Sequence, residues 1–131
     1  MRIFRDGETA LRSADPRSFA GPAMTKLLAA GEEGADVHLY RVHFEPGART
    51  NWHTHSGPQW LFVIAGRVRV QRWGEAPQEV GEGDAVLFAP EEKHWHGAAP
   101  GYPEGGAHLA VNVNVTTTWL EPVTEAEYNA H

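Results

Sequence analysis

The sequence contains no cysteine among its 131 residues. Disulfide bonds and metal sites built from thiolates are therefore excluded, and the composition suits a reducing compartment, so we expect a cytoplasmic protein. No apolar run approaches the roughly 20 residues that a membrane helix needs. Positive charge is scarce as well, because 11 Lys and Arg stand against 17 Asp and Glu. The resulting net charge of −6 disfavours a phosphate backbone, so we expect neither nucleic acid nor membrane as a partner.

The residues that are abundant indicate many short elements. Hydrophobic residues make up 41% of the chain, enough for a core, and 14 glycines and 9 prolines are spread along it. Frequent turn residues between short apolar segments are typical of all-β domains. The length fits a single domain over residues 1–131.

Hydrophobic patterning predicts strands with almost no helix. Residues 1 to about 22 are polar and interrupted by Pro16, Gly21 and Pro22, so we expect an irregular N-terminal arm. Residues 24–30 fit either a strand or a helical turn, and residues 31–34 fit a turn. Two unbroken apolar runs, 60–64 and 85–89, predict buried strands, and alternating residues predict strands with one solvated face. The remaining predicted strands cover residues 37–44, 67–71, 78–80 and 108–115.

The spacing of these strands, about 8 to 12 residues, favours an antiparallel sandwich or barrel. Near the C-terminus, Thr124 and Glu127 form a capping-box pattern with Pro122 just ahead of it. One short C-terminal helix of about two turns is therefore expected.

Histidine is the most informative residue type, with eight copies, six of them between His43 and His108. Histidine is the commonest metal ligand in proteins. His53 and His55 are two residues apart, so both project from the same face of an extended strand. Gln59 keeps the same parity, and His94 must arrive by folding from another segment. The imidazoles of His53 and His55 can therefore converge on one ion.

The combined spacing resembles the two motifs of the cupin superfamily. In the first motif, the intervals between Gly47, His53, His55, Gln59 and Gly66 are five, one, three and six residues. The second motif consists of Gly83-Asp84, Pro90 and His94. The resemblance implies a small antiparallel cupin barrel, the double-stranded β-helix or jelly roll, with its motif-bearing part at about residues 36–118. It also implies that one divalent ion is held by His53, His55, Gln59 and His94. Glycines at positions 47, 66 and 83 suit tight turns at strand ends, because glycine reaches positive φ without steric cost.

The chain departs from the cupin pattern at three points. Gln59 stands where most cupins carry a glutamate, Ala89 stands at the position of the usual first proline, with Pro90 one place later, and Glu91 stands where a glycine is usual. The last two departures put the geometry of that turn in question.

Six further segments carry a narrower resemblance, over about residues 36–128, and they are Phe44–Thr50, Trp52–His55, Lys93–Ala98, His108–Ala110, Val123–Glu125 and Tyr128. Together they resemble bacterial cupin hydroxynitrile lyases, in which three histidines and a glutamine hold manganese or another divalent ion. This resemblance implies that His108 lies beside the metal as a general base and that Thr50 bonds the substrate.

The residues themselves indicate what such a site can do. Three neutral imidazoles and an amide leave the ion its full charge, so it acts as a strong Lewis acid. The ligand types suit manganese, iron, cobalt, nickel or zinc. His96 shares the parity of His94, and either carries a proton or orients a ligand. We expect the pocket to include Tyr40, Val42, Trp95 and Asn112, and its aromatic character favours a flat aromatic substrate.

Three hypotheses follow, and the sequence leaves all three open. The leading one is a metal-dependent carbon–carbon lyase that splits a cyanohydrin into aldehyde and cyanide. The second is an oxygen-using cupin such as a small dioxygenase, and the third is a non-catalytic module that binds a small molecule or a metal. We also expect a homo-oligomer, a dimer or a tetramer, because five tryptophans and the N-terminal arm can supply an interface.

Overall fold

The computed structural model describes residues 1–31 and 34–131. The turn predicted at residues 31–34 includes Glu32 and Glu33, which lie outside the described residues. Among the described residues, no helix is long and apolar enough to cross a membrane. The elements are η1 (Asp6–Glu8), β1 (Arg12–Ser13), β2 (Phe19–Ala20), β3 (Ala23–Gly31), β4 (Val37–Phe44), β5 (Arg49–Thr50), β6 (His53–His55), β7 (Gln59–Arg72), β8 (Gln78–Gly81), β9 (Ala85–Phe88), β10 (His94–Ala98), β11 (Gly106–Val113), β12 (Thr117–Trp119) and α1 (Glu125–Tyr128).

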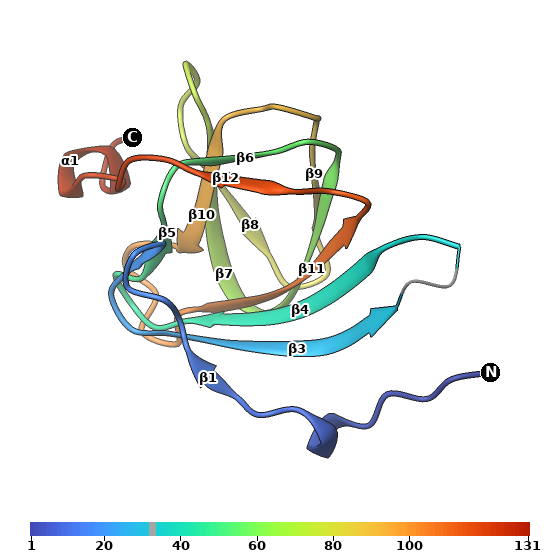
Figure 1. The fold of residues 1–131 in the computed structure, drawn as a ribbon. Coiled ribbons are helices and arrows are strands. Elements are labelled where there is room, and N and C mark those ends of the chain that lie inside the picture. Colours follow the sequence, from blue (N-terminus) through green and yellow to red (C-terminus); the bar gives the residue numbers. More distant parts are fainter. Residues whose placement is uncertain (32–33) are drawn as a thin grey trace.

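The strands form a curled antiparallel sheet, which confirms the predicted all-β barrel. Its main path runs β1-β3-β4-β11-β7-β10-β5-β2, while β6 pairs with β10 and β12, and β8 and β9 pair with β7. Figure 1 shows β3, β4 and β11 on one side of the barrel and β6, β10 and β12 on the other. This arrangement places the histidines of β6 and β10 opposite His108 of β11.

Strand β7 joins the two sides of the barrel. Its first half pairs with β9 and β11, and its second half pairs with β8 and β10. The sequence predicted two strands separated at Gly66, but β7 is continuous, so that prediction is wrong at this position. Gly66 has a φ of 63° in mid-strand. A Cβ there would lie 2.1 Å from the Gly105 carbonyl oxygen, so only glycine permits this bend.

The interior is filled by alternate residues of each strand. Leu61, Val63, Val68, Val70, Phe88 and Ala110 form the main core cluster. The unbroken apolar runs are not buried throughout, contrary to the prediction. Trp60 is 51% exposed and Phe62 is 46% exposed, and Phe88 alone is buried within β9. Strands in an antiparallel sheet alternate between the core and the solvent even where the outward residues are apolar.

The N-terminal arm is more regular than its polar sequence suggested. β1 pairs with β3, and β2 pairs with β5. The choice left open at residues 24–30 is decided in favour of a strand, because β3 pairs with β4 along its length. The arm is thereby held against the barrel at two places, and β2 brings Phe19 next to β5.

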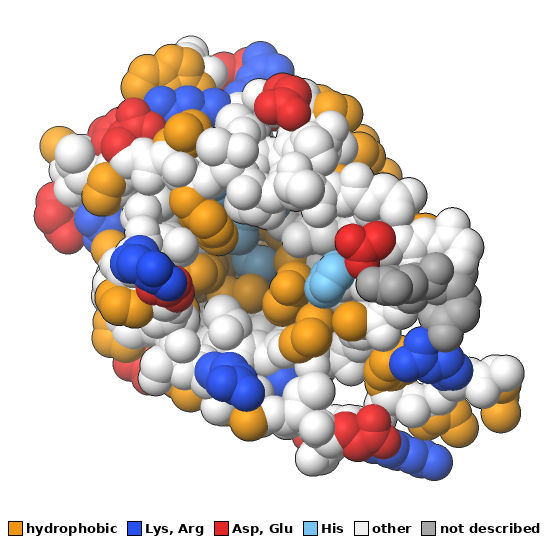
Figure 2. Space-filling model, viewed as in Figure 1, with side chains coloured by type: hydrophobic (Ala, Val, Ile, Leu, Met, Phe, Trp, Pro, Cys, Tyr) orange, Lys and Arg blue, Asp and Glu red, His pale blue; other side chains and the backbone are white. Residues whose placement is uncertain are grey.

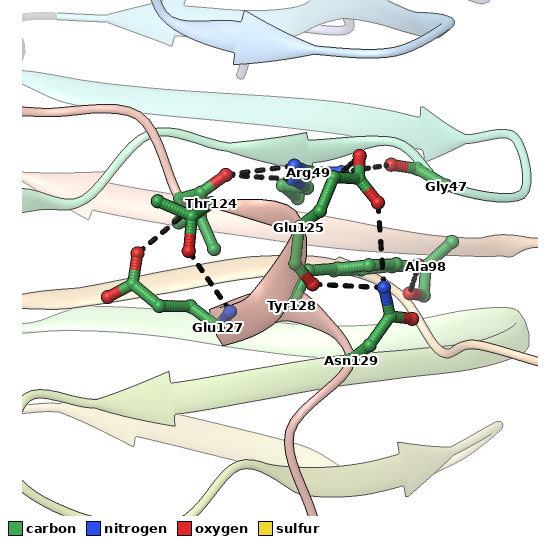
Figure 3. Close-up of polar contacts among 9 residues, drawn as sticks. Gly47, Arg49, Ala98, Thr124, Glu125, Glu127, Tyr128 and Asn129 are labelled. Carbon is green, nitrogen blue, oxygen red and sulfur yellow. Dashed lines mark hydrogen bonds and ion pairs between the residues drawn. The ribbon is translucent and has the colours of Figure 1, made fainter.

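The C-terminal helix α1 is present with the predicted capping box, but it spans only the four residues Glu125–Tyr128, about one turn rather than the expected two. Thr124 accepts a hydrogen bond from the Glu127 amide, and the Glu127 carboxylate accepts one from the Thr124 amide. Arg49 of β5 connects that strand to the helix. Its buried guanidinium donates a hydrogen bond to the Val123 carbonyl oxygen at 2.8 Å and forms an ion pair with Glu125 (Figure 3). The Tyr128 hydroxyl donates to the Ala98 carbonyl oxygen.

Candidate metal centre

The predicted ligands come from three strands that meet inside the barrel. His53 and His55 lie on β6, Gln59 begins β7 and His94 begins β10. His94 is paired directly with His53 in the antiparallel register of β10 and β6. This register brings a residue from the distant second motif beside the first.

The four side chains converge. The ring centroids of His53 and His94 are 4.3 Å apart, those of His53 and His55 are 5.1 Å apart, and those of His55 and His94 are 5.4 Å apart. The Gln59 Oε1 atom lies 3.3 Å from His94 Nε2. All four residues are buried. Buried side chains from separate strands are therefore close enough to share one ion.

Two of the imidazoles are oriented by backbone carbonyl groups. The His53 Nδ1 atom lies 2.8 Å from the Asn51 oxygen, and the His94 Nδ1 atom lies 2.7 Å from the Glu92 oxygen. A carbonyl oxygen only accepts hydrogen bonds, so each ring carries its proton on Nδ1 and leaves Nε2 unprotonated. This tautomer is the one that a metal requires at Nε2.

The other two ligands are oriented by side chains. The His55 Nδ1 atom lies 2.9 Å from the Thr117 hydroxyl oxygen. The Gln59 Nε2 atom donates to Asn112 Oδ1 at 2.9 Å. The His55 Nε2 atom is buried and has no hydrogen-bond partner among the described residues. A buried nitrogen without a partner is unfavourable unless a ligand satisfies it, so the residues present fit a metal ion.

Burial keeps these imidazoles neutral. It lowers the pKa of His53 well below 6.5, and the neighbouring His94 lowers it further. Burial lowers the pKa of His94 to about 4. It also lowers the pKa of His55, although a contact with the Gln59 side chain opposes that shift. Neutral imidazole is the form that binds metal, so the site is prepared for a cation at neutral pH.

His96 belongs to the same cluster. One ring nitrogen from each of His53, His94 and His96 lies within 4.8 Å of the other two, so these three can also hold a metal ion. This trio includes His96 where the sequence predicted His55. The His96 Nε2 atom is buried and lacks a hydrogen-bond partner among the described residues, as does that of His55. The geometry thus brings five possible ligands together rather than four.

His96 also forms a pair with His108. The His108 Nε2 atom lies 3.0 Å from His96 Nδ1, and both rings are buried. Burial lowers the pKa of His96 well below 6.5 and that of His108 to about 4. Thr50 accepts a hydrogen bond from the His96 backbone amide at 3.2 Å. Two neutral imidazoles that share one hydrogen bond can accept a proton at one ring and pass it to the other.

A cavity of about 290 Å³ opens beside these groups, at the small end of the range for ligand pockets. Figure 2 shows histidine side chains on the floor of a hollow bordered by hydrophobic side chains. The cavity lining includes Tyr40, Val42, Thr50 and Asn112, which are among the site residues named in the sequence analysis.

Trp95 was predicted to line the pocket and does not. It lies between His94 and His96 on β10, and alternation along the strand turns it to the opposite face. There its ring packs 5.7 Å from that of Tyr128, and its Nε1 donates to Gln71 Oε1 at 2.8 Å.

The sequence analysis did not place five of the lining residues in the site, namely Phe19, Thr25, Ala110, Thr117 and Trp119. Phe19 comes from the arm, while Thr117 and Trp119 come from β12. The Trp119 ring lies 4.6 Å from that of His53 and 5.9 Å from that of Phe19. The same-face spacing of Thr117 and Trp119 was visible in the sequence, but nothing there indicated that β12 pairs with β6.

Comparison with known proteins identifies related chains. Residues 40–102 match the family described as the cupin domain. Over 98% of its length the chain is 41% identical to the (R)-mandelonitrile lyase of Granulicella tundricola, of which it covers 98%. A cupin-like protein from Thermotoga maritima has a TM-score of 0.83 and 36% identity, with 98% of this chain and 95% of that one covered.

A more distant structure shares the fold alone. The polyketide cyclase RemF from Streptomyces resistomycificus has a TM-score of 0.74 at 19% identity, with 98% of this chain and 89% of that one covered. The same barrel therefore occurs in proteins with different functions, and the function of this chain must be argued from its own site.

Proposed function

The chain belongs to the cupin family, and on that premise we propose that it is a manganese-dependent hydroxynitrile lyase. The reaction would split the cyanohydrin of an aromatic aldehyde into the aldehyde and hydrogen cyanide. The observation that carries the proposal is the convergence of His53, His55, Gln59 and His94, each with its own orienting partner. The relative with 41% identity, a mandelonitrile lyase, supports this choice among cupin activities.

We assign the ion to the predicted set rather than to the trio that includes His96. The Nε2 atoms of His55 and His96 both lack a partner among the described residues, so the choice rests on Nδ1. His55 Nδ1 is held by the Thr117 hydroxyl, which is the arrangement expected of a ligand. His96 Nδ1 is held by another imidazole, which suits a group that handles protons. A divalent ion bound by neutral ligands would supply Lewis-acid polarisation of the substrate oxygen or of cyanide.

The proton of the substrate hydroxyl is assigned to the His96–His108 pair. With a proton on His96 Nδ1 donated to His108 Nε2, the His96 Nε2 atom is left as a free acceptor. As the carbon–carbon bond breaks, its electron pair leaves with cyanide and the hydroxyl proton moves to the pair. The same proton then converts cyanide into hydrogen cyanide, which regenerates both neutral rings.

The cavity suits a small flat substrate. Tyr40, Phe19 and Trp119 provide aromatic walls, and the described residues that line it include no acidic side chain. Because Thr50 Oγ1 accepts from the His96 amide, its own hydroxyl hydrogen remains available for a substrate oxygen. These groups would hold an aromatic cyanohydrin with its polar end towards the histidines.

The test is the cleavage of mandelonitrile by protein loaded with Mn²⁺, followed through the absorbance of benzaldehyde. We expect turnover that disappears in His53→Ala and falls by about 10²- to 10⁴-fold in His108→Phe, the usual contribution of an acid–base group. His43→Ala is the matched control, because His43 is an exposed histidine on β4. If the manganese-loaded protein gives no turnover above the His53→Ala background, the lyase proposal is wrong.

We further propose that the protein is a homo-oligomer joined through the outer face of its sheet. Trp60 is flanked in register by Leu87 on β9 and Val111 on β11. Phe62 lies on the same face, and Trp60, Phe62, Leu87 and Val113 are each more than 40% exposed. Exposed apolar side chains on neighbouring strands are the part of the surface best suited to contact a second copy.

Light scattering of purified protein tests this interface. We expect a dimer or tetramer that dissociates in Trp60→Glu. Trp73→Glu is the control, because Trp73 is 54% exposed but lies beyond the sheet face, where it contacts Lys93. A wild-type monomer at high concentration, or equal effects of both substitutions, contradicts the proposed interface.

A further inference from the structure

Gln59 differs from the other proposed ligands because its two ends are chemically opposite. The Oε1 atom accepts and can bind a cation, whereas the Nε2 amide donates and repels one. The two ends have nearly the same size and shape, so packing alone does not choose between them. A carboxylate at position 59 would present an oxygen to the cation in either orientation, and a histidine would present a ring nitrogen.

Asn112 contacts the end of Gln59 that must face away from the ion. Its Oδ1 atom accepts from Gln59 Nε2 at 2.9 Å, and the Gln59 Oε1 atom is left 3.3 Å from His94 Nε2. The contact bridges adjacent strands, since Gln59 on β7 and Asn112 on β11 are directly paired. Paired residues on one face have neighbouring Cβ atoms, so the backbone register itself holds the two amides together.

The backbone of Asn112 is paired on both sides. It is also the register partner of His38 on β4, so it lies between two strands rather than at an edge. Gln59 is buried, and a buried amide that lost its acceptor would be left with an unsatisfied donor or would turn over. The hydrogen bond to Asn112 therefore sets which end of Gln59 reaches the centre of the site.

We infer that Asn112 is a positioning residue that makes Gln59 a metal ligand by selecting its Oε1 end. The inference rests on the metal site of the proposed function. It assigns to Asn112 a role through Gln59 and no contact with the reacting atoms. The role is specific to an amide ligand, because both ends of a glutamate side chain bind a cation equally well.

The test measures Mn²⁺ affinity by calorimetry on metal-stripped protein, in four variants that form a cycle. We expect Asn112→Leu to weaken binding by about 10- to 100-fold, the usual effect of removing a group that orients a ligand. In a Gln59→Glu background, Asn112→Leu should change the Mn²⁺ affinity by no more than about twofold. A change of that size is within the error to which the effects of independent substitutions add. Asn112→Asp, which keeps the acceptor, should restore the affinity lost in Asn112→Leu.

Two controls separate positioning from general damage. Gln78→Leu makes the same kind of change at an exposed amide on β8 and should leave affinity unchanged. Urea unfolding of each metal-stripped variant shows whether the fold itself is weakened. Equal losses of affinity in the parent protein and in the Gln59→Glu background, or no loss in either, overturn the inference.

The outcomes also distinguish this inference from the proposed function. If the parent protein binds Mn²⁺ and the cycle shows coupling but mandelonitrile is not cleaved, the role of Asn112 stands and the lyase assignment fails. If the parent binds no stoichiometric Mn²⁺, both fail.

Discussion

Replacing Thr117 by valine removes one hydroxyl group from the neighbourhood of the proposed ion and almost nothing else. Valine has the same branched shape and is equally suited to a strand. Thr117 lies on β12, and its Oγ1 atom is 2.9 Å from His55 Nδ1. The substitution therefore deprives a buried imidazole of the contact that fixes its orientation while the strand pairing of β12 with β6 is kept.

The expected loss can be worked from this contact. Without the hydroxyl, the His55 ring can turn over, and a twofold choice of orientation weakens metal binding by about a factor of two. The lost contact also lowers the basicity of the ligating nitrogen and leaves a buried N–H unsatisfied, which typically costs about 1–3 kcal/mol. The unsatisfied N–H destabilises the metal-free protein as well, so only part of this energy appears in binding. We expect Mn²⁺ affinity to fall by about tenfold, equivalent to about 1.4 kcal/mol.

Calorimetric titration of metal-stripped protein measures this loss directly. Thr118→Val is the matched control, since Thr118 is exposed on the same strand and pairs with Thr54. The reasoning is refuted if Thr117→Val binds Mn²⁺ as tightly as Thr118→Val, because the hydroxyl would then play no part in orienting His55.

Three further predictions concern stability, each measured by urea unfolding of metal-stripped protein. Arg49→Met should lower the free energy of unfolding by about 2–3 kcal/mol, because the carbonyl oxygen of Val123 loses the donors of the buried guanidinium. A decrease below about 0.5 kcal/mol would contradict this. Glu91→Gly should raise the free energy of unfolding by up to about 1 kcal/mol, since Glu91 has a φ of 63° and glycine adopts this conformation without strain. A destabilised variant would show that the turn needs the Glu91 side chain. The free energy of unfolding should decrease as the pH drops from 6.5 towards 4. Burial lowers the pKa of His94 and His108 to about 4, so the unfolded chain binds more protons than the folded one in that window. A flat profile would mean that these rings are not buried in the neutral form.

Part of the candidate site was predictable from local periodicity. The two-residue step between His53 and His55 places both imidazoles on one face of β6 wherever that strand lies, and the capping box at Thr124 starts α1 through contacts within one turn. The assignment of His94 to the metal ligands depended on the resemblance to the cupin motifs. His94 lies 35 positions after Gln59, and no local pattern links residues so far apart. The left-handed turn at Glu91 is kept without the usual glycine, which a pattern of residue types could not have decided.

Which residues share a face can be read from the sequence alone, because side chains alternate along an extended chain. Which face is turned inward, and what covers it, depends on how the strands pair and pack. Trp95 thus faces Tyr128 rather than the cavity, and Trp60 remains exposed within an apolar run. The tertiary structure also decided which distant groups orient the ligands, such as Thr117, because strand register is set by pairing between segments that no local signal connects.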